Sequence, residues 1–308
     1  MQEKLTLRKT IDMIKLSLFL TWFWPLPKDL VIFELENFCK LIKPDEEAIC
    51  QQYIDKYAFF CGGCMTCIYL FVFVIIAAPV ALDQPFPTNA EYPFDIYHQP
   101  VRSILFIHQS ICALQTAAHL CLNFFTAFLL LFTSARFELL IKKLRAVTNI
   151  YDLMKCVQEH QKLLKYAEQV AYLIRPYALI TITFSTFGLI IIGLIFITDQ
   201  PLPMKIECIS LACSGLSEVI MYTWPAEHLI EISSKMGEAI YDIKWYGQSL
   251  ELQRSLQIIL MRSQKPTTIA ISGIMPSLSL NYYASYISTI LSYFTTLRVF
   301  MQSNQDVN

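Results

Sequence analysis

The sequence predicts an all-α membrane protein: a polytopic helical bundle of about five spans, with a cytoplasmic N-terminus and an extracellular C-terminus. Hydrophobic residues make up 55% of the 308 residues and charged residues only 16%, whereas globular proteins carry roughly 25% charged residues. The apolar residues form long uncharged stretches, and the basic residues between them are unevenly distributed. These observations exclude two soluble domains, and the net charge of −1 gives no reason to expect nucleic acid.

Four stretches without Asp, Glu, Lys or Arg are long enough to cross a bilayer. A helix needs roughly 20 apolar residues to span about 30 Å of hydrocarbon, and these stretches contain between 23 and 33 residues. In the last stretch the apolar part begins at Tyr282. We therefore predict spans within 57–82, 103–135, 176–198 and 266–297.

A fifth span is predicted at 206–230, which is mostly apolar but contains Glu207, Glu218 and Glu227. Two of these carboxylates can lie at the membrane surfaces, whereas Glu218 falls inside. A carboxylate within the bilayer is costly and normally faces protein or a water-filled cavity. We therefore expect protein rather than lipid beside Glu218.

The N-terminal region, 1–56, is predicted to be cytoplasmic and interfacial. Its uncharged stretch 16–27 has only 12 residues, which is too short to span a bilayer. Trp22 and Trp24 in this stretch favour the headgroup region. Two prolines and the lack of a small-residue cleavage site argue against a signal peptide.

The basic residues predict the orientation. With five spans, eight Lys and Arg residues precede the first span, eight lie in 136–175 and five in 227–265, which is 21 of the 24. The other three, Arg102, Lys205 and Arg298, fall on the opposite side. By the positive-inside rule the larger set is cytoplasmic, and five spans then place the C-terminus outside.

The predicted spans divide the rest of the chain into three parts. Residues 57–230 form the transmembrane bundle, with a cytoplasmic helical extension at 136–175 that continues the neighbouring spans. Residues 231–268 form cytoplasmic helices, broken at Gly247. Residues 269–308 contain the last span and a short outer tail.

Motifs for catalysis and cofactor binding are absent from the sequence. It contains no P-loop, no G-x-G-x-x-G, no G-x-S-x-G and no H-E-x-x-H. Cys61, Cys64 and Cys67 have metal-like spacing, but they lie in an apolar span without a fourth ligand nearby. We therefore expect no enzyme, no cofactor and no metal. A small transporter, suggested by Glu218 alone, is disfavoured because no inverted repeat is found.

An ordered set of short motifs lies in the C-terminal third: MGEAIYDIKWY at 236–246, RSQKP at 262–266, SLSL at 277–280 and SYFTTLR at 292–298. Together with Tyr92-Pro-Phe-Asp95 in the first outer loop, this set resembles the insect odorant receptor family. The order of the motifs and the inverted topology carry the resemblance, because no single motif is specific.

The resemblance covers roughly 10–30 and 34–300 and includes one departure. Family members usually have seven spans. The stretch at 33–36 is similar to the cytoplasmic helix before the family's third span, so the first two spans are expected to be missing. An alternative transcript, an incomplete gene model and real divergence all stay open as explanations.

The resemblance implies a multi-pass plasma-membrane protein, a subunit of a ligand-gated, non-selective cation channel. Such subunits form a hetero-tetramer with a shared odorant receptor co-receptor and detect volatile small molecules. Their other expected partner is membrane lipid. Two alternatives stay open: a truncated, non-conducting or modulatory subunit, and a gustatory-type receptor of the same superfamily, whose C-terminal motif is not matched.

The resemblance also implies roles for particular residues. The last span would line the pore with a stripe of hydroxyls that solvate cations, although small polar residues also favour helix packing. Aromatic and polar residues on three spans would form the odorant pocket, with ordinary core packing as the alternative. A cytoplasmic cluster would anchor the subunits, because Trp, Tyr and Arg often dominate interfaces; a solvated loop is its alternative.

The pore candidates are Ser285, Ser288, Ser292 and Thr296, the last at the family's usually hydrophobic gate position. The ligand-binding candidates are Tyr69, Phe73, His108, Ile111, Gln115, His119, Leu216, Ile220 and Tyr222. The subunit-anchor candidates are Asp242, Trp245, Tyr246, Arg262 and Lys265.

Overall fold

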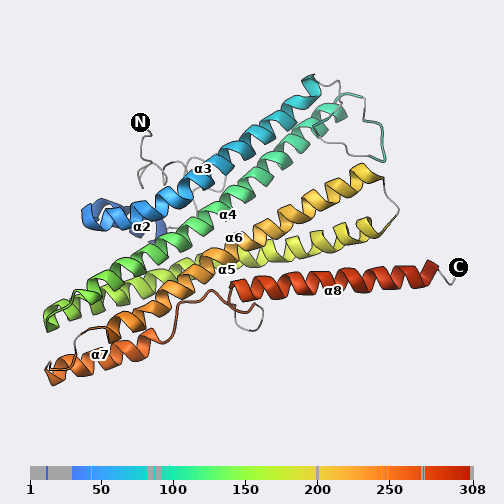
Figure 1. Cartoon of the computed structure of the whole chain (residues 1–308). Helices are drawn as coiled ribbons and strands as arrows, with labels where there is room; N and C mark the ends of the chain where they lie inside the picture. The colour runs from blue at the N-terminus through green and yellow to red at the C-terminus, as the bar shows by residue number, and fades with distance from the viewer. Residues whose placement is uncertain are drawn as a thin grey trace. The chain divides into compact units, whose positions relative to one another are not determined.

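A computed structural model describes residues 12, 30–42, 44–81, 86–87, 92–96, 98–198, 201–243, 245–247, 249–271, 273 and 275–305. Their regular structure is helical, as predicted, apart from one isolated antiparallel bridge between Ile271 and Met275. The predicted interfacial stretch at 16–27 lies outside the described residues. The helices are α2 (Leu30–Leu41), α3 (Pro44–Ala81), α4 (Val101–Arg145), α5 (Ile150–Ile197), α6 (Leu202–Tyr241), α7 (Leu250–Ser263) and α8 (Leu280–Gln305) (Figure 1).

The chain divides within α4 into two compact units, 1–125 and 126–308. The first unit contains α2, α3 and the first part of α4. The second contains the remainder of α4 and helices α5 to α8. α3 begins at Pro44, a residue suited to the first turn of a helix. It is therefore longer than the span predicted at 57–82, because the polar residues that precede the apolar stretch continue the same helix.

Among the described residues, α4 and α5 are long and apolar enough to cross a membrane, judged by length and composition. α3 contains a shorter apolar stretch, Thr66–Pro79. The helical membrane bundle agrees with the predicted fold class, while the five spans and their orientation stay predictions.

The segment predicted to be a cytoplasmic extension consists of the C-terminal end of α4 and the N-terminal part of α5. Asn149 caps α5, because its side-chain Oδ1 accepts a hydrogen bond of 2.9 Å from the Asp152 backbone N–H. Lys143 Nζ donates to Glu159 Oε2 over 2.8 Å. Both helices run without a break into the predicted spans, as the pattern predicts.

Tyr166 lies at the centre of this helix pair and is fully buried. Its ring meets Phe132 edge-on, with centroids 6.5 Å apart, and the Arg136 guanidinium lies 4.4 Å from its centroid. Nearby, Phe137 and the buried His160 also meet edge-on at 6.5 Å. Aromatic and cation–π contacts therefore join α4 to α5 at this level.

α6 continues as one helix through the predicted domain boundary at 231, past the internal Pro225. The helix ends only at Tyr241, and the connection to α7 contains Gly247 with φ of +90°. This left-handed conformation is readily adopted by glycine. The break therefore falls where Gly247 predicts it. α7 then starts behind Ser249, whose hydroxyl accepts a hydrogen bond from the Leu252 backbone N–H.

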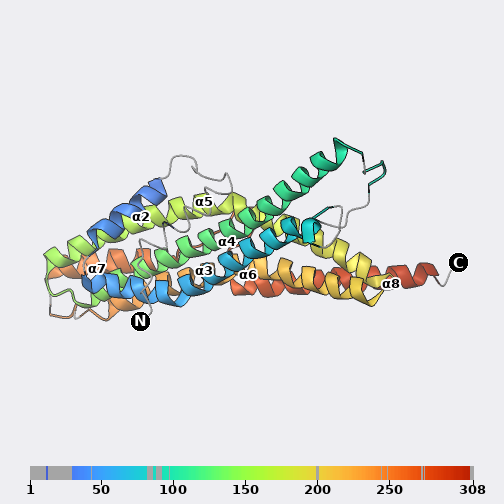
Figure 2. The ribbon, with the colours of Figure 1, turned by 90° about the horizontal axis from the view of Figure 1, so that it is seen from above.

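Side chains of α6 hold the segment that leads into α8. Ser233 Oγ accepts a hydrogen bond of 3.0 Å from the Thr267 backbone N–H. Glu227 Oε2 accepts one of 2.9 Å from the Leu280 backbone N–H, at the first residue of α8. A carboxylate is favourable at this positive end of a helix. α8 then lies against both α5 and α6 (Figure 2).

Candidate ligand-binding site

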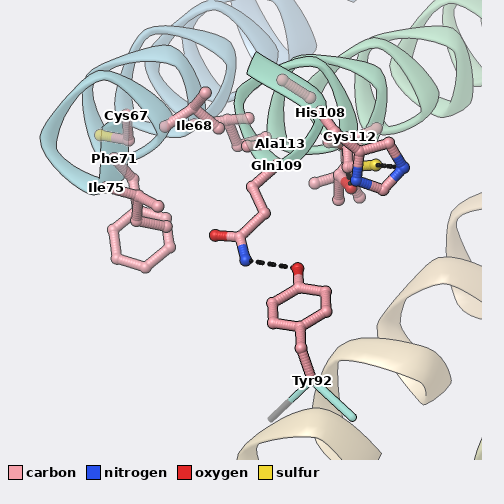
Figure 3. Close-up of a pocket in the computed structure, with 13 residues that line it drawn as sticks. Cys67, Ile68, Phe71, Ile75, Tyr92, His108, Gln109, Cys112 and Ala113 are labelled. Atoms are coloured by element: carbon pink, nitrogen blue, oxygen red, sulfur yellow. Dashed lines mark hydrogen bonds between the residues drawn. The ribbon is translucent and has the colours of Figure 1, made fainter. Parts of the chain in front are cut away.

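A cavity of about 850 Å³ lies between α3 and α4 in the first unit (Figure 3). Ligand pockets usually measure about 300–1,000 Å³ and are mainly apolar with a few placed polar groups. The cavity has both properties. It is lined by Cys67, Ile68, Phe71, Val72 and Ile75 from α3, by Tyr92 from the connection between α3 and α4, and by His108, Gln109, Cys112, Ala113, Thr116, Ala117 and Leu120 from α4.

Gln109 and Tyr92 point toward one another at the cavity wall (Figure 3). The Gln109 side chain is only 6% exposed, and its Nε2 donates a hydrogen bond of 2.9 Å to Tyr92 Oη. The Tyr92 ring meets Phe86 and Phe94, with centroids 6.2 and 5.5 Å away. Aromatic contacts and a hydrogen bond thus hold the loop tyrosine at the cavity.

His108 and Cys112 form a second polar pair in the lining. His108 Nε2 lies 3.8 Å from Cys112 Sγ, one helical turn away (Figure 3). Thr116 Oγ1 donates to the Cys112 carbonyl over 3.0 Å. Over the part of the chain that the structure describes, no group of three or more His, Cys, Asp or Glu side chains could hold a metal.

Of the ligand-binding residues predicted in the first unit, His108 lines the cavity. Tyr69 instead forms a side-chain hydrogen bond with Cys121, and Phe73 is largely exposed. The other predicted positions on α4 are 111, 115 and 119, whereas the cavity is lined from 109, 112, 116 and 120. A shift of one residue rotates a helix face by about 100°. In the sequence, the face that lines the cavity could have been recognised by Gln109 and Thr116, which alternate with the small residues Ala113 and Ala117.

The ligand-binding residues predicted on α6 lie in the second unit. Tyr222 is fully buried, with its hydroxyl 3.4 Å from that of Thr181. Leu216 lines a smaller cavity of about 250 Å³ between α5, α6 and α8, and its carbonyl accepts a 3.3 Å hydrogen bond from Tyr283. Ile220 is exposed. These three residues therefore have different environments.

Glu218 faces protein, as predicted for a carboxylate within a span. Ser185 Oγ on α5 donates a hydrogen bond of 3.2 Å to its Oε2. At the next residue, Thr186 Oγ1 donates to the Tyr286 hydroxyl on α8 over 3.3 Å. These two hydrogen bonds connect α5 to α6 and to α8.

α8 has two contrasting faces. Tyr286 is buried, and Ile290, Phe294 and Leu297 line the cavity shared with α5 and α6. The predicted pore residues occupy the opposite side of the helix and are exposed. They are Ser285, Ser288, Ser292 and Thr296. Thr296 Oγ1 donates its proton to the Ser292 carbonyl over 2.8 Å, so the hydroxyl oxygen remains as an acceptor on the exposed face.

The predicted anchor residues lie in the α6–α7 connection and at the end of α7. Asp242 Oδ2 is 3.8 Å from Arg145 Nε. Trp245 and Tyr246 are both exposed and meet edge-on with centroids 6.0 Å apart. Trp245 also borders a cavity of about 200 Å³ between α6 and α7, which it shares with Gln253, a residue absent from the sequence prediction.

The remaining two anchor candidates lie together at the C-terminal end of α7, Arg262 in its last turn and Lys265 just beyond it. Arg262 donates to the Lys265 carbonyl over 3.4 Å, and both side chains are exposed. Three of the five predicted residues therefore lie in the α6–α7 connection and the other two at the end of α7, and all five are exposed in the single chain.

Comparison with known proteins identifies the family. The family model described as 7tm Odorant receptor matches residues 34–291. The chain is 25% identical over 247 residues to Odorant receptor 30a of Drosophila melanogaster, covering 77% of this chain and 64% of that protein. It is 33% identical over 85 residues to the Odorant receptor coreceptor of Anopheles gambiae, covering 28% of this chain and 18% of that protein.

A solved structure shares the fold. The olfactory receptor OR5 of Machilis hrabei, in complex with eugenol, superposes with a TM-score of 0.72 and 16% identity, covering 94% of this chain and 79% of that chain. The chain spans less than two thirds of the length of the curated relatives that it matches. The protein belongs to the odorant receptor family. Its relatives are membrane receptors rather than enzymes, in agreement with the prediction.

Proposed function

We propose that the chain is an odorant receptor subunit of the plasma membrane, part of a ligand-gated, non-selective cation channel that detects volatile small molecules. The two-faced character of α8 carries this proposal. One face packs on α5 and α6 of the same chain, and the opposite face presents Ser285, Ser288, Ser292 and Thr296 outward. Hydroxyl oxygens on a helix that lines a central axis solvate cations without binding them tightly.

The cavity beside Gln109 is the proposed odorant site. Its volume of about 850 Å³ and its mainly apolar lining suit a neutral volatile molecule. The described residues of the lining include no Asp, Glu, Lys or Arg, so a charged ligand would lose hydration without gaining an ionic partner among them.

The proposed partner is the odorant receptor co-receptor, in a hetero-tetramer. The stretch similar to the Anopheles gambiae coreceptor supports a shared architecture. The anchor residues of the α6–α7 connection supply the proposed contact, because Trp245 keeps 41% of its surface exposed in the single chain. Exposed aromatic side chains of this kind frequently become central to interfaces.

The direct test is co-expression with a co-receptor and current recording across a panel of volatile compounds. We expect odorant-evoked cation currents, and Ser292→Val should alter their ion selectivity because it removes a hydroxyl from the stripe. Thr183→Val is the matched control, since it removes an exposed hydroxyl from α5. No evoked current, despite verified surface expression, contradicts channel function. Assembly without current would favour the non-conducting alternative.

The anchor is tested by Trp245→Ala, which should lower the yield of the assembled oligomer in detergent sizing while leaving the odorant preference of residual channels unchanged. Tyr151→Ala is the control, because Tyr151 is an exposed aromatic at the start of α5, outside the anchor. An unchanged oligomer yield for Trp245→Ala would contradict the anchor role.

A further inference from the structure

We propose that the Tyr92 hydroxyl, oriented by Gln109, is the hydrogen-bond donor by which the cavity selects ligands that carry an acceptor oxygen: aldehydes, ketones and esters. The inference rests on the proposed odorant site and names the ligand class it prefers. It is carried by the Tyr92–Gln109 geometry within the first unit (Figure 3).

The direction of the hydrogen bond determines what Tyr92 can still do. Gln109 Nε2 is the donor and Tyr92 Oη is the acceptor, 2.9 Å apart. A phenolic hydroxyl both donates and accepts, so this contact uses a lone pair of Oη and leaves its O–H proton for a second partner. Because Tyr92 lines the cavity, a ligand oxygen inside it can be that partner.

The tyrosine is held in position before a ligand arrives. Phe86 is buried and Phe94 lies on the same loop, and both pack against the Tyr92 ring. Gln109 is nine-tenths buried, and a buried amide that loses a hydrogen-bond partner is destabilised. This requirement keeps the tyrosine and the amide together. A preorganised donor loses little conformational freedom on binding, so more of its interaction contributes to affinity.

The other polar groups of the lining contact their own helix. Thr116 donates its hydroxyl proton to the Cys112 carbonyl, and His108 Nε2 contacts Cys112 Sγ. Most of the remaining wall is aliphatic or aromatic carbon, from residues such as Phe71 and Ile75. An acceptor oxygen therefore has a defined place at Tyr92, while the rest of the ligand meets apolar surface.

The test measures equilibrium binding to the purified chain in lipid nanodiscs, independently of any current. Two pairs of probes match in shape and differ in the acceptor: acetophenone against α-methylstyrene, and benzaldehyde against styrene. A net hydrogen bond corresponds to about a 2- to 13-fold change in affinity. We expect the wild-type chain to prefer the carbonyl member of each pair by about this factor.

Tyr92→Phe should abolish that preference by weakening the carbonyl probes alone, with the hydrocarbons bound as before. Gln109→Leu keeps the phenol but removes the group that orients it, so the preference should fall as well. Tyr53→Phe is the matched control, because it removes a phenolic hydroxyl from α3 of the same unit at a position outside the described cavity lining, and it should retain the preference.

Distinct results would overturn the inference. If Tyr92→Phe weakens both members of each pair equally, Tyr92 only shapes the loop. If wild type binds both members equally, no selecting donor exists. If folded wild-type chain, verified by circular dichroism, shows no saturable binding of either probe, the proposed odorant site itself fails, together with the inference that rests on it.

Discussion

The two halves of α5 form one uninterrupted helix, yet their side chains are arranged differently. The first half, 150–175, buries one regular stripe that includes Leu163, Tyr166 and Val170 and carries polar residues elsewhere. The second half, 176–197, contains an apolar window in which only 22% of the residues are buried. There, large side chains such as Phe184 are exposed.

The difference indicates which solvent each half meets. An amphipathic helix with one apolar stripe is typical of a surface bordered by water, whereas a helix that is apolar all round needs protein or lipid on every side. The first half of α5 has the pattern expected of a cytoplasmic extension at 136–175, and the second half has the pattern expected of a span at 176–198; both assignments stay predictions.

The largest expected effect lies in the packed half. Tyr166→Ala should destabilise the protein by about 3–5 kcal/mol, the usual range for removing a large buried aromatic, because Tyr166 is fully buried between Phe132 and Arg136. Thermal unfolding in detergent measures the loss. Tyr172→Ala, at an exposed position of the same helix half, should change stability little. Equal losses for both variants would contradict the packing account.

Two arginine substitutions test whether the two halves of α5 meet different solvents. Phe184→Arg should impair membrane insertion by about 2.5–3.5 kcal/mol, the insertion scale for arginine at the centre of a span. Tyr172→Arg should be tolerated, because that position faces water in our interpretation. Both side chains are largely exposed within the chain, so they form a matched pair. Insertion measured in microsomes would refute the assignment if the two variants behaved alike.

A smaller effect is expected from pH. Burial lowers the pKa of His160 below its ordinary value of 6.5, and the positive charge of Arg262 acts in the same direction. The unfolded chain therefore binds the proton more readily, and the free energy of unfolding should fall as the pH drops through 6.5 toward the folded-state pKa. Unfolding temperatures at several pH values should show a shallower decline for His160→Gln than for wild type. Parallel curves would count against this role.

The smallest effect concerns two glycines in the apolar second half of α5. Gly188→Ala should stabilise α5 by up to about 1 kcal/mol of helix propensity, because a Cβ there meets nothing within 4 Å. At Gly193 the new Cβ would lie 3.3 Å from the Phe294 ring of α8, so part of that gain should be lost. Unfolding temperatures compare the variants, and a larger gain at Gly193 would show that α8 accommodates the methyl group freely.

Helix positions were largely predictable, because a long charge-free stretch indicates a helix removed from water and the apolar periodicity indicates which side packs. The residues at which the helices begin and end were harder to predict. α3 starts before its predicted span, since the polar residues after Pro44 are as compatible with a helix as the apolar ones. α6 passes 231 without interruption, and no local signal separates its membrane part from its continuation. Between α6 and α7, Gly247 marked the break.

The cavity was only partly predictable. His108 was found because histidine is conspicuous on an apolar helix, but the lining face of α4 is centred one position later, on Gln109 and Cys112. Rotational phase depends on what packs against a helix, which periodicity alone does not specify. The partner of Gln109 comes from a loop 17 residues earlier. Tyr92 was visible as part of a motif, but its place at the cavity depends on tertiary structure.

The hydrogen bond from Leu280 to Glu227 holds the first residue of α8, which would be the pivot of any tilt of that helix. Polar contacts to the other helices follow at Tyr283 and Tyr286, and apolar side chains beside the smaller cavity support the helix further along. With a rise of about 1.5 Å per residue, Ser285 lies about 8 Å from the pivot and Thr296 about 24 Å. A small tilt of α8 would therefore act as a lever, displacing Thr296 about three times as far as Ser285.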